Sequence, residues 1–236
     1  MWLQIRNNRE MVDSVTLDPI EPNWNHAALL TIDMQNDFAL PSGAGFILGT
    51  DAIVPAFARL IRIFRERELP IFHAARLYLE DGSNAERCRQ QILRSGLSLA
   101  RPGTTGARVV DAIAPSSAPD ISSRLLGGEY VPLGPSEWMF YKSRWSAFYE
   151  TGLETRLQSL EIDTVVVAGC NFPNCPSATL FDASERRLRV VLVADAVSGI
   201  AESGILWCRG IGVTPLSVDQ IQDCVPSAAN HRVDVI

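Results

Sequence analysis

A cysteine between an expected strand and an expected helix has the setting that most favours chemistry. The run from Thr164 to Ala168 is β-branched and apolar, which is typical of a strand buried in a parallel sheet. Gly169 ends that strand, and Ser177 to Leu188 has helical spacing, with Pro176 suited to the first turn. Cys175 is therefore expected at the helix N-terminus, where free N–H groups and the helix dipole favour a thiolate and predict a lowered thiol pKa. The alternative is a small buried cysteine at a structural corner.

Two ionisable residues follow other expected strands. Asp33 comes directly after the apolar run Ala27 to Ile32, and Lys142 comes after Glu137 to Tyr141. Side chains at the carboxyl ends of parallel strands gather at one edge of an open α/β sheet. Asp33 and Lys142 could therefore meet Cys175, and a base, a cation and a nucleophile form a workable hydrolytic set.

The composition of the chain excludes several other classes of function. The 236 residues are 47% hydrophobic and 20% charged, with a net charge of −6, so no basic surface for nucleic acid or for a membrane is expected. No signal segment or bilayer-spanning stretch is evident, which predicts a cytoplasmic protein. The hydrolytic set described above predicts a small-molecule substrate. Five cysteines without framework spacing fit a reducing compartment.

No cofactor or metal is expected. The three histidines are not paired at ligand spacing, and His73 is interpreted as a hydrogen-bonded residue near the sheet. The loop Pro41 to Thr50 contains three glycines, but Leu48 stands where a dinucleotide fingerprint needs the last one.

The order of the expected elements predicts one doubly wound, three-layer α/β/α domain with a mainly parallel sheet. This domain spans residues 27–225, between an N-terminal arm (1–26) and a short C-terminal tail (226–236). Long connections such as Leu77 to Thr105 often cover a site, although an inert excursion from the domain is an equal alternative. Further strands are expected at 11–16, 70–74, 189–194 (ending at Asp195) and 212–216, and helices at 51–68, 85–94, 107–114 and 201–209.

Separate motifs in this order resemble the isochorismatase-like superfamily of cysteine hydrolases, which includes nicotinamidases, N-carbamoylsarcosine amidohydrolase and ureido-compound hydrolases. The resemblance covers about Ala27 to Thr214 and implies a Rossmann-like hydrolase fold. It rests on Ile32 to Phe38, on Lys142 to Phe148, on Gly169 followed six residues later by Cys175, and on Val193 to Gly199.

The resemblance implies a role for each matching residue. Asp33 would take the proton of the Cys175 thiol, and Lys142 would hold both groups by charge. A cis peptide would fall at Cys170-Asn171, and the N–H groups of Asn171 and Cys175 would form an oxyanion hole. The implied reaction cleaves the C–N bond of a small amide, ureide or imide through a thioester, and relatives of this kind are commonly dimers or tetramers.

Some features depart from the relatives and leave alternatives open. Nicotinamidases carry a metal-binding Asp-x-His after the second strand, whereas this region reads His73 to Tyr78 without that motif. An isochorismatase-type ether hydrolase is a second possibility, although such a reaction needs no nucleophilic cysteine. A non-catalytic binding or redox protein using Cys170 and Cys175 is a third. Phe38, Trp145 and Phe172 are expected pocket walls, although each could equally belong to the core.

Overall fold

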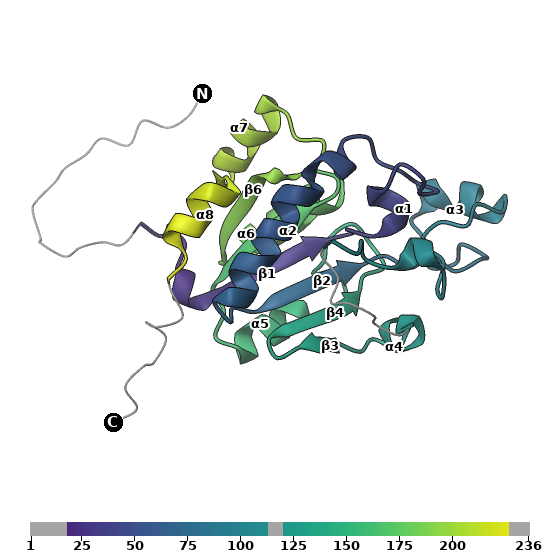
Figure 1. Cartoon of the computed structure of the whole chain (residues 1–236), viewed down its shortest axis with the longest axis horizontal. Coiled ribbons are helices and arrows are strands. Elements are labelled where there is room, and N and C mark those ends of the chain that lie inside the picture. Colours follow the sequence, from purple (N-terminus) through teal and green to yellow (C-terminus); the bar gives the residue numbers. More distant parts are fainter. Residues whose placement is uncertain (1–17, 113–119, 227–236) are drawn as a thin grey trace, which may run out of the picture.

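The computed structural model describes residues 18–112 and 120–226. Within these ranges one seven-stranded sheet forms the centre of the molecule, in the order β3-β4-β2-β1-β5-β6-β7 (Figure 1). All neighbouring pairs are parallel except β3 and β4, which are antiparallel. The strands are β1 (Ala27–Ile32), β2 (Ile71–Ala75), β3 (Val131–Gly134), β4 (Glu137–Tyr141), β5 (Thr164–Gly169), β6 (Arg189–Val197) and β7 (Val213–Leu216).

Helices cover both faces of the sheet. One face carries α2, which packs on β2, β5 and β6, with α8 beside it, and Figure 1 shows both helices in front of the strands. On the other face, α6 packs on β5 and β6, and α7 packs on β7. The helices are α1 (Asn36–Ala39), α2 (Thr50–Glu66), α3 (Arg87–Arg94), α4 (Ser122–Leu126), α5 (Leu153–Ser159), α6 (Cys175–Glu185), α7 (Glu202–Gly210) and α8 (Val218–Cys224), with 3-10 turns at Trp24–His26 and Thr105–Ala107.

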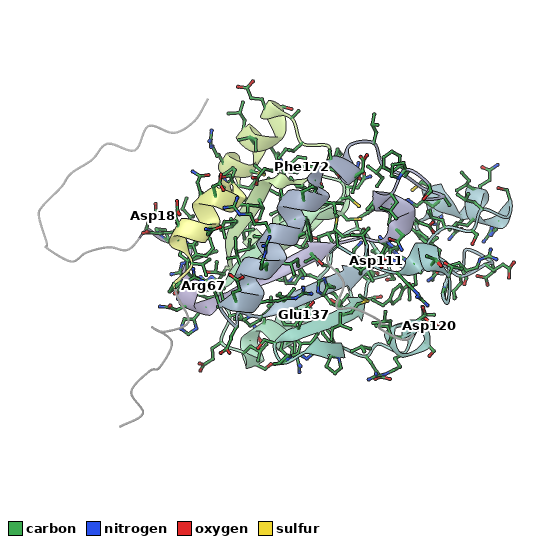
Figure 2. The ribbon with its side chains drawn as sticks, in the orientation of Figure 1. Asp18, Arg67, Asp111, Asp120, Glu137 and Phe172 are labelled. Carbon is green, nitrogen blue, oxygen red and sulfur yellow. The ribbon has the colours of Figure 1, made fainter. Side chains whose placement is uncertain are left out.

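The apolar run of β5 is explained by burial on both faces. Val166 lies in the hydrophobic cluster on the α2 side, whereas Val165 and Val167 lie in the cluster on the α6 side. Successive strand residues point to opposite faces, so a strand that is covered on both sides needs apolar residues at every position. Figure 2 shows the side chains of the described residues on these strands and helices, in the orientation of Figure 1. The predicted doubly wound three-layer fold is confirmed.

The structure corrects some expected elements. The helix expected from residue 107 is wrong in the described part, because a 3-10 turn ends at Ala107 and Val109 instead forms an antiparallel bridge with Gln35. The strand expected to end at Asp195 continues to Val197. The strand β3 and the helices α4 and α8 were not predicted, and the strand expected at residues 11–16 lies outside the described residues.

Among the helices of the described ranges, none has the length and apolar character that crossing a bilayer requires.

Candidate active site

The carboxyl ends of four adjacent strands lie at one edge of the sheet. Ile32 near the end of β1 pairs with Ala74 of β2 on one side and with Gly169 of β5 on the other. Ala74 in turn pairs with Phe140 of β4. Because the strands are parallel and in this register, the residues that follow them meet at the same edge. The three residues predicted to act together all lie there.

A buried ion pair joins the ends of β1 and β4. The Lys142 Nζ donates a hydrogen bond of 2.8 Å to Oδ2 of Asp33, and the two residues are 0% and 5% exposed. Backbone N–H groups of both residues donate to β2, from Asp33 to Ala74 O and from Lys142 to Ala75 O, at 3.0 Å each. The pair is therefore fixed by the sheet itself. The other carboxylate oxygen of Asp33, Oδ1, is buried and accepts no N–H or O–H bond from the described residues.

Cys175 is the first residue of α6 and is only 3% exposed. The thiol pKa is raised above its ordinary value, because burial disfavours the thiolate and the negative charge of Asp33 acts in the same direction. The positive charges of Lys142 and Arg76 act in the opposite direction and do not outweigh burial. The lowered pKa predicted from the helix N-terminus is therefore wrong for the free protein, and the thiol needs a base.

Asp33 is placed to be that base. The negative charge of its carboxylate contributes to the raised pKa of the Cys175 thiol, so the two groups interact electrostatically. A carboxylate held against a protonated thiol by a neighbouring ammonium has the arrangement required for proton transfer between the two groups.

The turn between β5 and α6 presents two backbone N–H groups. The peptide bond between Cys170 and Asn171 is cis, at the position that the sequence resemblance implies. The turn is held by bonds from Phe172 N to Ser198 O at 2.7 Å and from Asn174 N to Asn171 O at 3.0 Å. In the part of the chain that the structure describes, the N–H groups of Asn171 and Cys175 have no acceptor. Two such donors beside a nucleophile can stabilise an oxyanion.

Cys170 has a structural contact of its own. Its thiol is 1% exposed and donates to the carbonyl oxygen of Asp33 over 3.1 Å. Burial raises the pKa of this thiol well above its ordinary value. Both Cys170 and Cys175 are free thiols.

Gly169 allows β5 to approach the end of β1. Its φ is +128°, and a Cβ built on it would lie 2.2 Å from the carbonyl oxygen of Ile32 and 2.8 Å from the nitrogen of the same residue. A backbone this close leaves no room for any side chain. The approach brings together the residues that follow, Asp33 and Cys170.

The segment after Asp33 fixes the surrounding loops. The buried amide of Gln35 donates to Arg76 O and to Ala107 O at 2.7 Å each, and it accepts from Arg76 N at 2.7 Å. The carboxylate of Asp37 accepts from the backbone N–H groups of Ala44 and Ala100. The motif from Ile32 to Phe38 thus combines one candidate catalytic residue, Asp33, with two residues, Gln35 and Asp37, that hold loops in place.

Arg76 is a site residue for which the sequence leaves two roles open, as it does for Arg144: binding a substrate carboxylate, or the more common role of a solvated or structural arginine. It follows β2 directly, is 1% exposed, and its Nη2 lies 4.0 Å from the sulfur of Cys175. The same nitrogen lies 2.6 Å from Glu86 Oε1 and donates to Arg144 O over 2.6 Å. The one available signal was position, because Arg76 stands at a strand end as Asp33 and Lys142 do.

The connection that follows β2, over residues 77–105, covers this edge of the sheet. Glu86 contacts Arg76 from that segment, and the guanidinium of Arg89 lies 4.7 Å from the centre of the Trp145 ring. The carbonyl of Asn84 accepts a hydrogen bond of 3.0 Å from Arg144. The long connection therefore does lie over the site.

The residues at the end of β2 and directly after it do not fit a metal ion. His73 uses both ring nitrogens, with Nδ1 bonded to Thr31 Oγ1 at 2.8 Å and Nε2 to Glu137 Oε1 at 2.7 Å. Arg76 adds a positive charge where a metal ligand would need a lone pair. Within residues 18–112 and 120–226, no group of three or more His, Cys, Asp and Glu residues could hold a metal.

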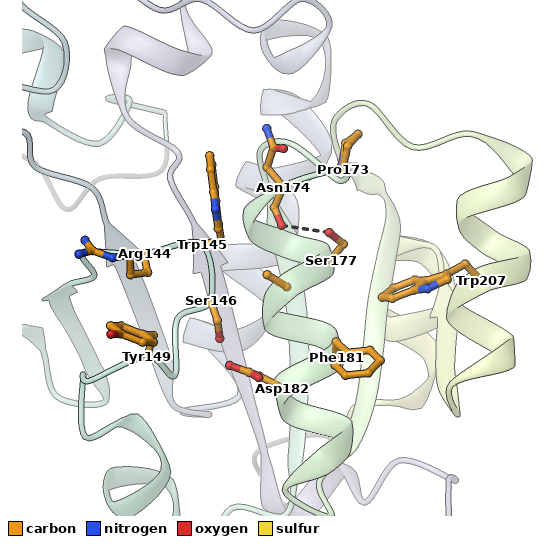
Figure 3. Close-up of a pocket in the computed structure, with 11 residues that line it drawn as sticks. Arg144, Trp145, Ser146, Tyr149, Pro173, Asn174, Ser177, Phe181, Asp182 and Trp207 are labelled. Carbon is orange, nitrogen blue, oxygen red and sulfur yellow. Dashed lines mark hydrogen bonds between the residues drawn. The ribbon is translucent and has the colours of Figure 1, made fainter. Parts of the chain in front are cut away.

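A pocket of about 630 Å³ lies on the outer side of α6. Figure 3 shows Trp145 and Tyr149 on one side of the helix and Trp207 of α7 on the other. Asp33, Lys142 and Cys175 are not among the lining residues of this pocket.

The three residues expected to form pocket walls differ in placement. Trp145 lines the outer pocket and is partly buried. Phe38 and Phe172 are 5% and 8% exposed and lie in the hydrophobic core, where the ring of Phe172 meets that of Trp207 edge-on at 5.9 Å. Substrate contact by any of the three stays a prediction.

Comparison with known proteins agrees with this geometry. The fold is that of an isochorismatase-like α/β hydrolase, and residues 27–204 match the family model described as the isochorismatase domain. The chain belongs to the isochorismatase family.

Three similar proteins show the range of that family. A relative from Arabidopsis thaliana, described as a probable inactive nicotinamidase, is 30% identical over 80% of this chain and 91% of its own length. A crystal structure of an isochorismatase family protein from Desulfovibrio vulgaris has 33% identity and a TM-score of 0.72, covering 84% of this chain and 97% of that one. The N-carbamoylsarcosine amidase of Thermoplasma acidophilum has 26% identity and a TM-score of 0.64, covering 82% and 96%.

Proposed function

We propose that this chain is a cysteine hydrolase that cleaves the C–N bond of a small amide, ureide or imide, with Cys175 as nucleophile. The observation that carries the proposal is the buried Asp33–Lys142 pair, 2.8 Å long, which interacts electrostatically with the buried thiol of Cys175. Such a pair gives the thiol a base and gives the base a fixed counter-charge. The N-carbamoylsarcosine amidase among the similar structures acts on a substrate of the proposed class.

The first half of the reaction forms a thioester. Asp33 takes the thiol proton while the sulfur of Cys175 bonds to the carbonyl carbon, and the carbonyl electrons move onto oxygen. The C–N bond then breaks, and the protonated Asp33 gives its proton to the departing nitrogen. Lys142 holds Asp33 in position and keeps a positive charge near the sulfur during both steps.

The negative oxygen of the tetrahedral intermediate needs donors that are already in place. The N–H groups of Asn171 and Cys175 lack acceptors in the described chain, so they are available to it. Removing one donor of this kind from an enzyme typically costs about 10²–10³ in rate.

The second half releases the acid. Water attacks the thioester carbon, and Asp33 takes the proton of the water. The C–S bond breaks, and Asp33 returns the proton to the sulfur. The sum is amide plus water giving carboxylic acid plus ammonia or amine, with the protein unchanged.

The alternatives explain fewer contacts. A redox pair of Cys170 and Cys175 would leave the Asp33–Lys142 pair without a role. In addition, the Cys170 thiol already donates a hydrogen bond to the carbonyl oxygen of Asp33. An ether hydrolase would not use the thiol of Cys175.

Ammonia release from a panel of small amides, ureides and imides tests the proposal. Cys208→Ala is a matched control, because Cys208 is also a buried free thiol and lies in α7, away from the site. We expect Cys175→Ala to abolish release and Cys208→Ala to retain it. Equal release by wild type and Cys175→Ala would overturn the proposal, as would release from none of the compounds.

A further inference from the structure

The guanidinium of Arg76 is buried with two of its nitrogens unpartnered. Nη2 contacts Glu86 Oε1 and Arg144 O, each at 2.6 Å. Nε and Nη1 are buried and have no hydrogen-bond partner among the described residues. A guanidinium carries five N–H donors, and leaving buried donors unsatisfied is costly. An acceptor that arrives with the substrate would satisfy them.

The position of this guanidinium is fixed by its surroundings. Gln35 clamps the backbone of Arg76 through both its N–H and its C=O. The side chain packs over the ring of Tyr78, with 5.5 Å between Cζ and the ring centre. Arg76 is therefore held in place before any ligand binds, which reduces the entropy cost of binding.

The charges around the sulfur favour an anion. Arg76 and Lys142 both lower the thiol pKa through their charge, and Arg89 also interacts electrostatically with Cys175. Asp33 and Glu86 are the opposing carboxylates. Three cations face two anions while the thiol is protonated, so the site has one positive charge in excess. A ligand with a single negative charge would neutralise it.

The distance from Arg76 to the sulfur limits the length of the ligand. The carbonyl carbon must come within about 3–3.5 Å of the attacking atom. Nη2 of Arg76 is 4.0 Å from that same atom, and Nε and Nη1 are bonded to the same carbon as Nη2. A carboxylate bonded to the guanidinium at about 2.8 Å can therefore belong to the same small molecule as the scissile carbonyl.

We propose that Arg76 binds a carboxylate of the substrate, and that this carboxylate is carried by the same small molecule as the scissile carbonyl. This inference rests on the proposed function and names its substrate class: short monoanionic amides and ureides. Neutral amides of the same shape are poor substrates, because they leave Nε and Nη1 unpartnered and the excess charge uncompensated.

Matched substrate pairs test the proposal in the intact protein. Ammonia release is compared for malonamate against malonamide and for oxamate against oxamide. We expect kcat/KM to favour the anion of at least one pair by about 100-fold, as for a charge-assisted hydrogen bond. Arg76→Gln should abolish this preference, mainly through KM. The ratio within a pair cancels any effect of Arg76 on the thiol itself.

Arg59→Gln is the matched control. Arg59 lies on α2 in an exposed ion pair with Asp219, outside the site. This variant should keep the preference for the anion. A ratio near one in the wild type, or a ratio that Arg76→Gln leaves unchanged, would overturn the proposal.

A direct binding measurement tests the carboxylate site at Arg76 independently of the proposed hydrolase activity. Titration calorimetry of Cys175→Ala with malonamate measures binding without chemistry. In the Cys175→Ala background, Arg76→Gln is combined with Glu86→Gln, so that both charges of the Arg76–Glu86 ion pair are removed and neither is left buried without a partner. We expect this triple variant to bind malonamate about 100-fold more weakly. Arg59→Gln in the same Cys175→Ala background should leave malonamate binding unchanged. Arg76-dependent binding without ammonia release would refute the hydrolase and keep the anion site. Ammonia release without Arg76-dependent binding would refute the anion site and keep the hydrolase.

Discussion

Lys142 Nζ lies 2.8 Å from Oδ2 of Asp33, and both side chains are almost fully buried. Each residue follows a parallel strand, and the backbone N–H of each donates to β2, which lies between those strands. A buried pair of this kind contributes little net stability. Removing one partner is nevertheless destabilising, because it leaves the other charge buried and unpaired. The pair is therefore best explained by the chemistry that it permits next to Cys175.

The first prediction separates the stability of this pair from its activity. Lys142→Met should lower the free energy of unfolding by about 3–5 kcal/mol, because Asp33 is left as a buried unpaired charge. Lys142→Met with Asp33→Asn should recover much of that stability in urea denaturation, yet neither variant should release ammonia. An active double variant would contradict the assigned roles.

The second prediction concerns the raised pKa of the Cys175 thiol. Iodoacetamide should alkylate Cys175 more slowly at pH 8 than an ordinary thiol, and the rate should continue to rise above pH 9. Asp33→Asn removes a negative charge that raises this pKa, so alkylation at pH 8 should become faster, by about tenfold for each unit of pKa lost.

The alkylation measurement needs a background without the exposed thiols. Cys88 and Cys224 are exposed and would react first, so both are replaced by serine. Slower alkylation of Cys175 in Asp33→Asn would show that Asp33 favours the thiolate, contrary to the electrostatics described here.

A third prediction tests the close approach of β5 to β1. Gly169→Ala should cost about 3 kcal/mol or more, because its Cβ would meet the backbone of Ile32 at 2.2 Å. Ammonia release should fall with it, since Ile32 directly precedes Asp33. Gly152→Ala is the matched control. Gly152 also has a positive φ, +71°, but nothing lies within 4 Å of its Cβ, so about 1 kcal/mol is expected.

A fourth prediction concerns acid stability. Burial alone would raise the pKa of the Glu137 carboxyl. Hydrogen bonds from Arg65 and His73 outweigh burial and lower this pKa to about 2. A depressed carboxylate pKa stabilises the fold above the unfolded-state value near 4.5, and this contribution is lost as the pH falls from there towards 2.

Urea midpoints across that pH range measure the effect. Glu137→Gln should be less stable at pH 7 and should lose less stability between pH 4.5 and 2 than the wild type does. Parallel curves for the two proteins would show that Glu137 titrates normally.

The sequence predicted the parts of the site that depend on local pattern. Apolar runs ending at Ile32, Tyr141 and Gly169 specify strands, and parallel strands place the residues after them at one edge. Strand β3 was missed because it is a short edge strand containing Pro132 and Gly134, both poor strand formers.

The remaining features depend on distances that the sequence does not contain. Glu86 meets Arg76 only because the connection after β2 folds back over the sheet edge. The raised pKa of Cys175 is a balance of burial against several charges from different strands, and only the folded arrangement sets the sign of that balance.

The most direct test of the central claim is peptide mass mapping of an acid-quenched turnover mixture, using the fastest substrate of the ammonia assay. A thioester mechanism predicts an added acyl mass on the peptide that contains Cys175. The adduct should be absent in Cys175→Ala and present in Cys208→Ala. Continued ammonia release without an acyl group on Cys175, or with the group on another residue, would contradict the account.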